Sequence, residues 1–192
     1  MIALLNYWWL KIQGITLLVF GRRNPAMDIF RQMLVLVPDD RYALASLAHG
    51  LAQGGQRDPA IDILKRLAVI SPENSAAWFN LGYMLDEAGR NAEAEEAFRH
   101  AVQISPKMDR AWYGLALILI KERRFDEAVE ALKKNTELQP MSPYGWYQLA
   151  RVHVDRQDPD EAVKVIRHLN RFEPKVAAQL ERETGLRIAP ST

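Results

Sequence analysis

Five prolines recur in this sequence at a constant interval of 34 residues: Pro38, Pro72, Pro106, Pro140 and Pro174. An insertion of a single residue anywhere between the first and the last of them would break the series, and the sequence contains none. A fixed interval of this length indicates one supersecondary unit that is repeated along the chain, with each copy packed on its neighbours. The interval therefore limits the fold more strictly than composition does.

Other positions keep the same interval, and each series keeps one type of side chain. A small series comprises Gly14, Ala48, Gly82, Ala116 and Ala150, and a large series comprises Phe30, Leu64, Phe98, Leu132 and Ile166. A further series holds Trp78, Trp112 and Trp146, with Leu10 and Leu44 at the two earlier positions. The small side chains allow two helix axes to approach closely, and the large ones fill the space opposite.

Each unit is predicted to fold as two amphipathic helices joined by a tight turn. Within residues 75–108, Trp78, Leu81 and Leu85 recur with the spacing of one helix face, and the second half of the unit repeats that spacing. Gly89 lies between the two halves, where a helix end favours a residue that is free to take positive φ. Each repeated proline is expected to end the second helix, because it lacks an N–H group and disfavours helical backbone before it.

The string from Ala77 to Tyr83, followed by Ala94, Phe98 and Pro106, resembles the signature of the tetratricopeptide-repeat family. The resemblance implies an all-α fold, a right-handed α-α superhelix of about five 34-residue helix-turn-helix repeats. The units are placed at 7–40, 41–74, 75–108, 109–142 and 143–176, with a capping helix and tail at 177–192. It also implies a protein that binds polypeptides. The resemblance does not identify the partner, because this scaffold serves many unrelated ones.

In that family the first helix of each unit lines a concave surface. Carried over by register, the groove-facing candidates are Tyr42, His49, Phe79, Tyr83, Arg110, Tyr113, Leu117, Tyr144, Tyr147 and Arg151. Aromatic rings offer a large contact area at low entropic cost, and arginine recognises carboxylates. We therefore expect a groove for an extended or helical peptide with apolar anchors, in which Arg110 and Arg151 bind an acidic group. The alternative is that several of these rings only pack against the next repeat.

A few positions depart from the repeat. His153 replaces a leucine of its series, and a buried or half-buried histidine with a hydrogen-bond partner is expected there. Asn135 stands where residues 75–108 have Ala101, which predicts looser or shifted stacking. Among the other histidines, His100 and His168 share one repeat position and are expected to face solvent.

Residues 1–20 contain one charged side chain, Lys11, and Arg22 and Arg23 follow after Gly21. Ten aliphatic or Phe side chains contribute roughly −3 to −6 kcal/mol to membrane insertion and Lys11 costs about 2.5–3.5 kcal/mol, so hydropathy alone does not decide whether the segment inserts. We expect residues 1–23 to form the first helix of the first repeat and to contact a membrane or a membrane subunit through Leu5, Trp8, Trp9 and Ile12.

Several alternatives stay open for this end of the chain. If it spans a bilayer as a transmembrane helix, the two arginines predict that the repeats lie on the cytoplasmic side. The same apolar end could instead form a homodimer, or simply pack within a soluble cytoplasmic protein. An apolar end without a polar cap is unusual for a solenoid, which favours a contact of some kind.

The sequence offers no chemistry for catalysis, and we expect no enzyme, metal or cofactor. It contains no Cys, and its four His do not have the spacing of helical zinc ligands. A formal net charge of +1 provides no field to attract nucleic acid. The predicted function is an adaptor, scaffold or assembly factor that binds a polypeptide and is associated with a membrane. The alternatives are a soluble partner-specific chaperone of a secretion or assembly system, or a permanent accessory subunit of a membrane complex.

Overall fold

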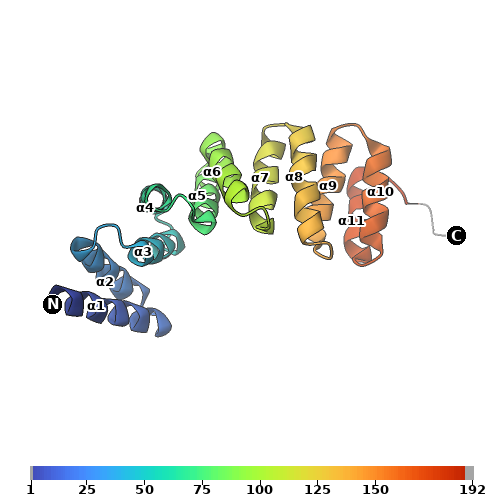
Figure 1. Ribbon diagram of the computed structural model, residues 1–192. Coiled ribbons are helices and arrows are strands. Elements are labelled where there is room, and N and C mark those ends of the chain that lie inside the picture. The colour runs from blue at the N-terminus through green and yellow to red at the C-terminus, as the bar shows by residue number, and fades with distance from the viewer. Residues whose placement is uncertain (1, 189–192) are drawn as a thin grey trace. The chain divides into compact units, whose positions relative to one another are not determined.

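The computed structural model describes the backbone of residues 2–188 and the side chains from residue 5 onward, and this part of the chain is all-α. Met1 and the expected tail at 189–192 lie outside the described residues. The helices are α1 (Ile2–Val19), α2 (Arg23–Leu36), α3 (Arg41–Gln53), α4 (Arg57–Ile70), α5 (Ser75–Glu87), α6 (Asn91–Ile104), α7 (Asp109–Lys121), α8 (Phe125–Leu138), α9 (Pro143–Asp155), α10 (Pro159–Asn170) and α11 (Pro174–Thr184) (Figure 1). The predicted helix-turn-helix repeats are confirmed.

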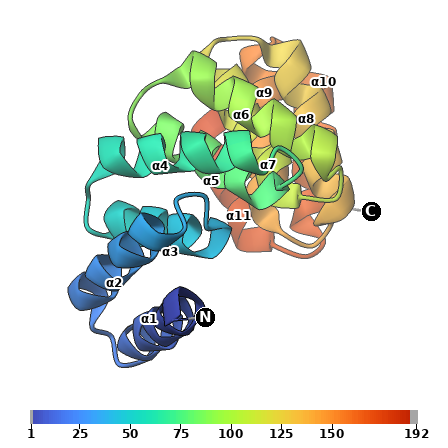
Figure 2. The same ribbon diagram turned by 60° about the vertical axis from the view of Figure 1, so that its left-hand side comes forward.

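The chain divides into two compact units, Met1–Ile104 with α1 to α6, and Ser105–Thr192 with α7 to α11. In the first unit each helix packs on the next in sequence, as α1 and α2 do in Figure 2. The second unit follows the same order, but its last helix, α11, packs on both α9 and α10. The second unit therefore ends in a helix that covers the preceding helix pair.

The turn between the two helices of every repeat contains one residue with left-handed backbone. These residues are Gly21, Gly55, Gly89, Arg123 and Gln157, and they keep the interval of 34 residues. The first three have φ between 69° and 75°, whereas Arg123 and Gln157 adopt 59° and 61° in spite of their side chains. The turn geometry is thus set by the repeat, and glycine is its low-strain solution.

The small and large series meet inside each repeat, and their sizes are matched. A Cβ atom added at Gly82 would lie 2.8 Å from the Phe98 ring, and one at Gly14 would lie 2.7 Å from the Phe30 ring. Both phenylalanines are almost fully buried. Where the small residue is alanine, the large one is an aliphatic residue such as Leu132. Glycine is therefore found where the facing helix carries a ring, which explains the two sizes in each series.

The tryptophans of the third series bind the chain that leads into their own helix. The indole Nε1–H of Trp78 donates to the carbonyl of Pro72 at 3.0 Å, and Trp112 and Trp146 bind Pro106 and Pro140 at 2.9 Å. The repeated proline thus contributes an acceptor as well as a helix stop. The prediction that every repeated proline ends a second helix is wrong for Pro174, which lies in the first turn of α11. A proline is tolerated there because its missing N–H would have no helical partner.

The predicted exposure of the two repeat-related histidines is wrong in part. His100 stacks on Trp78 at a ring-centroid distance of 4.3 Å, and His168 lies against Trp146 at 4.2 Å. Both imidazoles are half-buried. They cover the tryptophan rings, so they belong to the packing of their repeats.

Candidate functional site

In the first unit, the predicted groove residues come from α3 and α5. Tyr42 is half-buried and packs edge-to-face on Phe30 at 5.9 Å, while the ammonium group of Lys11 lies 4.9 Å from the Tyr42 ring centre. His49, two helical turns further along α3, is exposed. On α5, Phe79 is half-buried, and 54% of Tyr83 is exposed. At the predicted groove positions, α3 and α5 thus each carry one half-buried ring and one exposed ring.

In the second unit, the predicted residues come from α7 and α9. Tyr113 and Leu117 are half-buried on α7, and Arg110 is exposed at the start of that helix. On α9, 70% of Tyr144 is exposed, whereas Tyr147 is half-buried. Tyr144 is a large ring with most of its surface in solvent, and tyrosine is a residue type enriched among the energetically important residues of protein interfaces.

The acidic partner that was expected for Arg151 comes from the chain itself. Tyr147 donates its hydroxyl to Glu183 Oε2 at 2.5 Å, and Arg151 Nη1 lies 3.3 Å from that hydroxyl and 3.8 Å from the same carboxylate. Gln179 donates to the other carboxylate oxygen at 2.7 Å. These hydrogen bonds, from Tyr147 first and then Gln179, lower the pKa of Glu183. A partner carboxylate would therefore compete with α11 for Arg151.

The exposed apolar side chains of α1 belong to two faces. Trp8 and Ile15 precede Tyr42 and His49 by 34 residues, so they continue the groove register, and both are exposed. Leu5 and Ile12 are exposed on the same side of the helix at a spacing of seven residues. The sequence prediction grouped Leu5, Trp8, Trp9 and Ile12 as one contact surface, and the repeat register separates Trp9 from the others.

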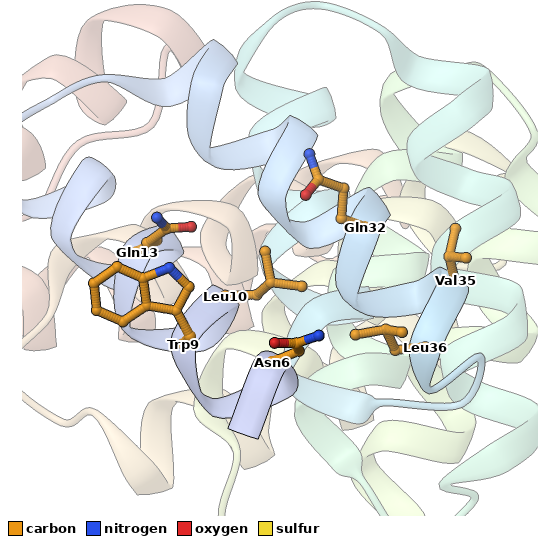
Figure 3. A pocket seen from close by; sticks show the side chains of 7 residues that line it. All are labelled: Asn6, Trp9, Leu10, Gln13, Gln32, Val35 and Leu36. Atoms are coloured by element: carbon orange, nitrogen blue, oxygen red, sulfur yellow. The ribbon is translucent and has the colours of Figure 1, made fainter. Parts of the chain in front are cut away.

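Trp9 lies on the terminal face, the surface that an earlier repeat would cover. In the next two repeats its position holds Ala43 and Ala77, both buried, whereas 61% of Trp9 is exposed. An open hollow of about 510 Å³ lies on this face. Figure 3 shows the side chains of α1 and α2 that line it. Its lining is uncharged and consists of Asn6, Trp9, Leu10, Gln13, Gln32, Val35 and Leu36. The terminal face is therefore an apolar surface with amide groups at its edges.

Helix α1 is held to the N-terminal end of α3 by a polar contact. The Tyr7 hydroxyl donates to Asp40 Oδ2 at 2.6 Å, and Asp40 Oδ1 caps α3 by accepting from the backbone N–H of Ala43. The hydrogen bond to Asp40, together with partial burial, raises the pKa of Tyr7 to about 12. The apolar helix is thus a built-in part of the first unit.

Along residues 2–188, no helix combines the length and the apolar character that crossing a bilayer requires. The transmembrane interpretation of residues 1–20 is corrected by this finding. Helix α1 has 18 residues, or about 27 Å, against a hydrocarbon core of about 30 Å, and Asn6, Lys11 and Gln13 interrupt its apolar sequence.

A second hollow, of about 270 Å³, lies between α1, α2 and α3. It opens beside groove positions that the sequence had indicated on α3. Its lining comprises Leu18, Arg23, Met27, Phe30, Tyr42, Ala45, Ser46, His49, Gly50 and Gln53. The sequence placed Tyr42, Ala45 and His49 on the groove surface, but it did not predict a hollow beside them.

Two family models described as tetratricopeptide repeat match the sequence, at residues 46–109 and 85–147. Together they cover more than half of the chain. The chain belongs to the tetratricopeptide-repeat family. Members of this family are typically non-enzymatic modules for protein interaction, and the repeats of this chain follow that fold through all their helices. No curated protein matches the sequence significantly.

Solved structures match the tetratricopeptide-repeat fold of the chain along most of its length. One is described as the crystal structure of MamA protein, at a TM-score of 0.83 and 20% identity, covering 96% of this chain and 98% of that one. MamA 41-end from Desulfovibrio magneticus RS-1 matches at 0.78 and 19%, covering 94% and 98%. YrrB, described as a TPR protein with an unusual peptide-binding site, matches at 0.79 and 16%, covering 88% of each chain. These similarities confirm the expected fold class, an all-α superhelical repeat.

Proposed function

We propose that this protein is a scaffold that binds a polypeptide along the first helices of its repeats. The observation that carries the proposal is the exposure of Tyr83 and Tyr144, two rings at groove positions in different units. Neither side chain forms a hydrogen bond or a ring contact among the described residues, so the fold does not require either ring. Rings presented in this way are typical anchors of protein interfaces. A match to YrrB, a protein described by its peptide-binding site, is consistent with the same use of the fold.

The assignment can be tested by site-specific crosslinking in cells. The photoreactive residue benzoylphenylalanine would replace Tyr83 or Tyr144 on first helices, and Val69 or Lys133 on second helices as exposed controls. The proposal predicts that both tyrosine positions crosslink to the same polypeptide and that both control positions do not. Equal crosslinking from the two sets of positions would show that the first helices do not form the binding surface.

We propose in addition that α1 holds the scaffold against an anionic membrane surface without crossing it. Exposed apolar side chains follow the length of α1 up to its last residue, Val19, and Phe20 in the following turn is exposed as well. Arg22 and Arg23 come next, and neither forms an ion pair within residues 2–188. Apolar side chains beside unpaired arginines suit the interface of a bilayer that contains anionic lipids.

Vesicle sedimentation tests this attachment. The full chain should bind vesicles of phosphatidylcholine and phosphatidylglycerol more tightly than vesicles of phosphatidylcholine alone, and the double variant Trp9→Ser, Ile12→Ser should lose most of that binding. Val69→Ser, which removes an exposed apolar side chain elsewhere, serves as the control. If the protein does not bind vesicles but is a dimer in solution, and the double variant dissociates that dimer, the apolar end is a homodimer surface. If the protein is a monomer and does not bind vesicles, the soluble chaperone alternative is favoured.

A further inference from the structure

The hollow between α1, α2 and α3 has a cause in the repeat series. Ala45 stands at the position that Phe79, Tyr113 and Tyr147 occupy in the next three repeats. Gly50 stands at the position of Met84, Ile118 and Val152, which are all buried. Two positions that carry large side chains in the later repeats thus carry alanine and glycine in α3. The hollow is therefore written into the sequence of the second repeat.

The floor of this hollow is apolar and closely packed. A Cβ atom at Gly50 would lie 2.8 Å from Cγ and Sδ of Met27, so the glycine allows the Met27 side chain to lie against α3. Met27 and Phe30 are buried, and Leu18 of α1 forms a partly exposed wall. At about 270 Å³, the hollow is smaller than the usual pocket for a drug-sized ligand, which measures about 300–1,000 Å³. It suits one large side chain.

The rim of the hollow is basic. Arg23 and His49 line it, and none of the lining residues is acidic. Arg23 forms no ion pair within the described chain, and the acidic residue Asp28 of the same helix is bound to Arg31 at 2.7 Å. An exposed guanidinium group beside an apolar hollow is complementary to a carboxylate that accompanies an apolar side chain.

We propose that this hollow, here called the anchor pocket, takes one aromatic or long aliphatic side chain of a bound polypeptide whose next residue is acidic. The apolar side chain enters between α1 and α3, over Met27 and Phe30, and the neighbouring carboxylate pairs with Arg23. This inference rests on the proposed function, because it names a recognition element within the groove. It assigns to the first unit a preference for an apolar side chain followed by an acidic one. In the second unit Arg151, the expected binding residue for an acidic group, already faces Glu183.

Titration of the full chain with acetyl-Phe-Asp-amide, followed by ¹H–¹⁵N NMR, tests the pocket directly. A dipeptide of this size should bind with a dissociation constant on the order of 1 mM. The amide signals of Ala45, Ser46 and Gly50 should shift most. Acetyl-Ala-Asp-amide, which lacks the ring, should bind about tenfold more weakly, and acetyl-Phe-Asn-amide, which lacks the charge, about threefold more weakly.

Two variants separate the apolar and the charged parts of the pocket. Ala45→Tyr places in α3 the ring that α7 and α9 carry at this position, and it should weaken binding at least about tenfold by filling the hollow. Ala45 is exposed, so the fold should accept the change. Arg23→Gln should leave the ring preference intact and abolish the preference for Asp over Asn. Arg22→Gln, next to the pocket but not lining it, is the matched control.

The proposal is overturned if the dipeptide shifts no signal around the hollow at concentrations of about 10 mM, or if Ala45→Tyr binds it as well as the original chain. Crosslinking from Tyr83 and Tyr144 is independent of these dipeptides. If crosslinking succeeds and the dipeptide fails, the pocket assignment is wrong and the proposed function stands. If both fail, the groove itself is wrong.

Discussion

The two units of this protein are built on the same 34-residue pattern, but they use it differently. The first unit has glycine at all three left-handed turns and pairs glycine with phenylalanine in two of its repeats. The second unit has Arg123 and Gln157 at its turns and no such pair. The first unit has exposed apolar side chains along α1, whereas in the second unit α11 packs on both helices of the repeat before it. The pattern thus fixes the helices, and the residues that depart from it give each unit its surfaces.

The second unit also contains polar side chains in core positions where the first unit is apolar. Leu67 packs with Ala77 in the first unit. The equivalent residues in the second unit are Asn135 and Gly145. Asn135 Nδ2 donates to the carbonyl of Asp109 at 2.9 Å. A Cβ atom at Gly145 would lie 2.2 Å from Asn135 Oδ1. Looser stacking was predicted at Asn135, but Gly145 on α9 lets the Asn135 side chain pack closely there. A polar substitution in one helix required a smaller residue in the next.

His153 is another buried polar residue of the second unit, and it differs from the prediction in one respect. It is buried as expected, but its Nδ1 atom has no hydrogen-bond partner among the described residues. The Asp158 carboxylate lies 3.8 Å from Nδ1, beyond hydrogen-bond distance. Burial, only partly opposed by Asp158, lowers the pKa of His153.

The largest expected effect concerns the glycine and phenylalanine pair of the first unit. Gly82→Ala should lower the free energy of unfolding by about 2 kcal/mol, because the added methyl group meets the Phe98 ring. The double variant Gly82→Ala, Phe98→Leu copies the Ala116 and Leu132 pair of the second unit and should recover most of the loss. Urea denaturation measures both. A single variant as stable as the original chain would show that the sizes are not matched as described.

A smaller effect distinguishes His153 from the leucines of its series. His153→Leu should raise the free energy of unfolding at pH 7 by about 1 kcal/mol, because it replaces a buried nitrogen that has no partner. Since the pKa is lowered in the folded chain, the unfolded chain binds the proton more readily. Stability should therefore be level above the ordinary pKa of about 6.5 and fall below it. Denaturation at pH 5 and pH 7 should show a smaller difference for the leucine variant; an equal difference would contradict this account.

The smallest stability effect concerns the turns. Arg123→Gly should stabilise the second unit by about 0.5 kcal/mol, because glycine accepts positive φ without strain and this outweighs the loss of the cation–π contact with Phe125. In the first unit, Gly89→Ala should cost about 1 kcal/mol at the equivalent turn. Thermal denaturation of the two variants should show midpoint shifts of opposite sign. Shifts of the same sign would mean that the left-handed turn is not what distinguishes them.

The repeat interval predicted the helices, their turns and the residues that face one another within a repeat, because these depend on one periodic pattern. It could not predict the pairing of Arg151 with Glu183, since α11 begins at Pro174 and leaves the register of the earlier first helices. It also missed the anchor pocket, which depends on two small residues, Ala45 and Gly50, occurring together. A hollow that arises from missing side chains, or a contact that depends on several residues departing from the repeat at once, leaves no periodic pattern in the sequence.

The central claim is that the open rings on the first helices form the binding surface for a polypeptide, and the double variant Tyr83→Ala, Tyr144→Ala tests it most directly. Neither ring supports the fold, so the melting temperature should stay unchanged. The affinity for the partner captured by crosslinking should fall by about 10- to 100-fold, measured by isothermal titration calorimetry. An unchanged affinity in a folded double variant would contradict the claim.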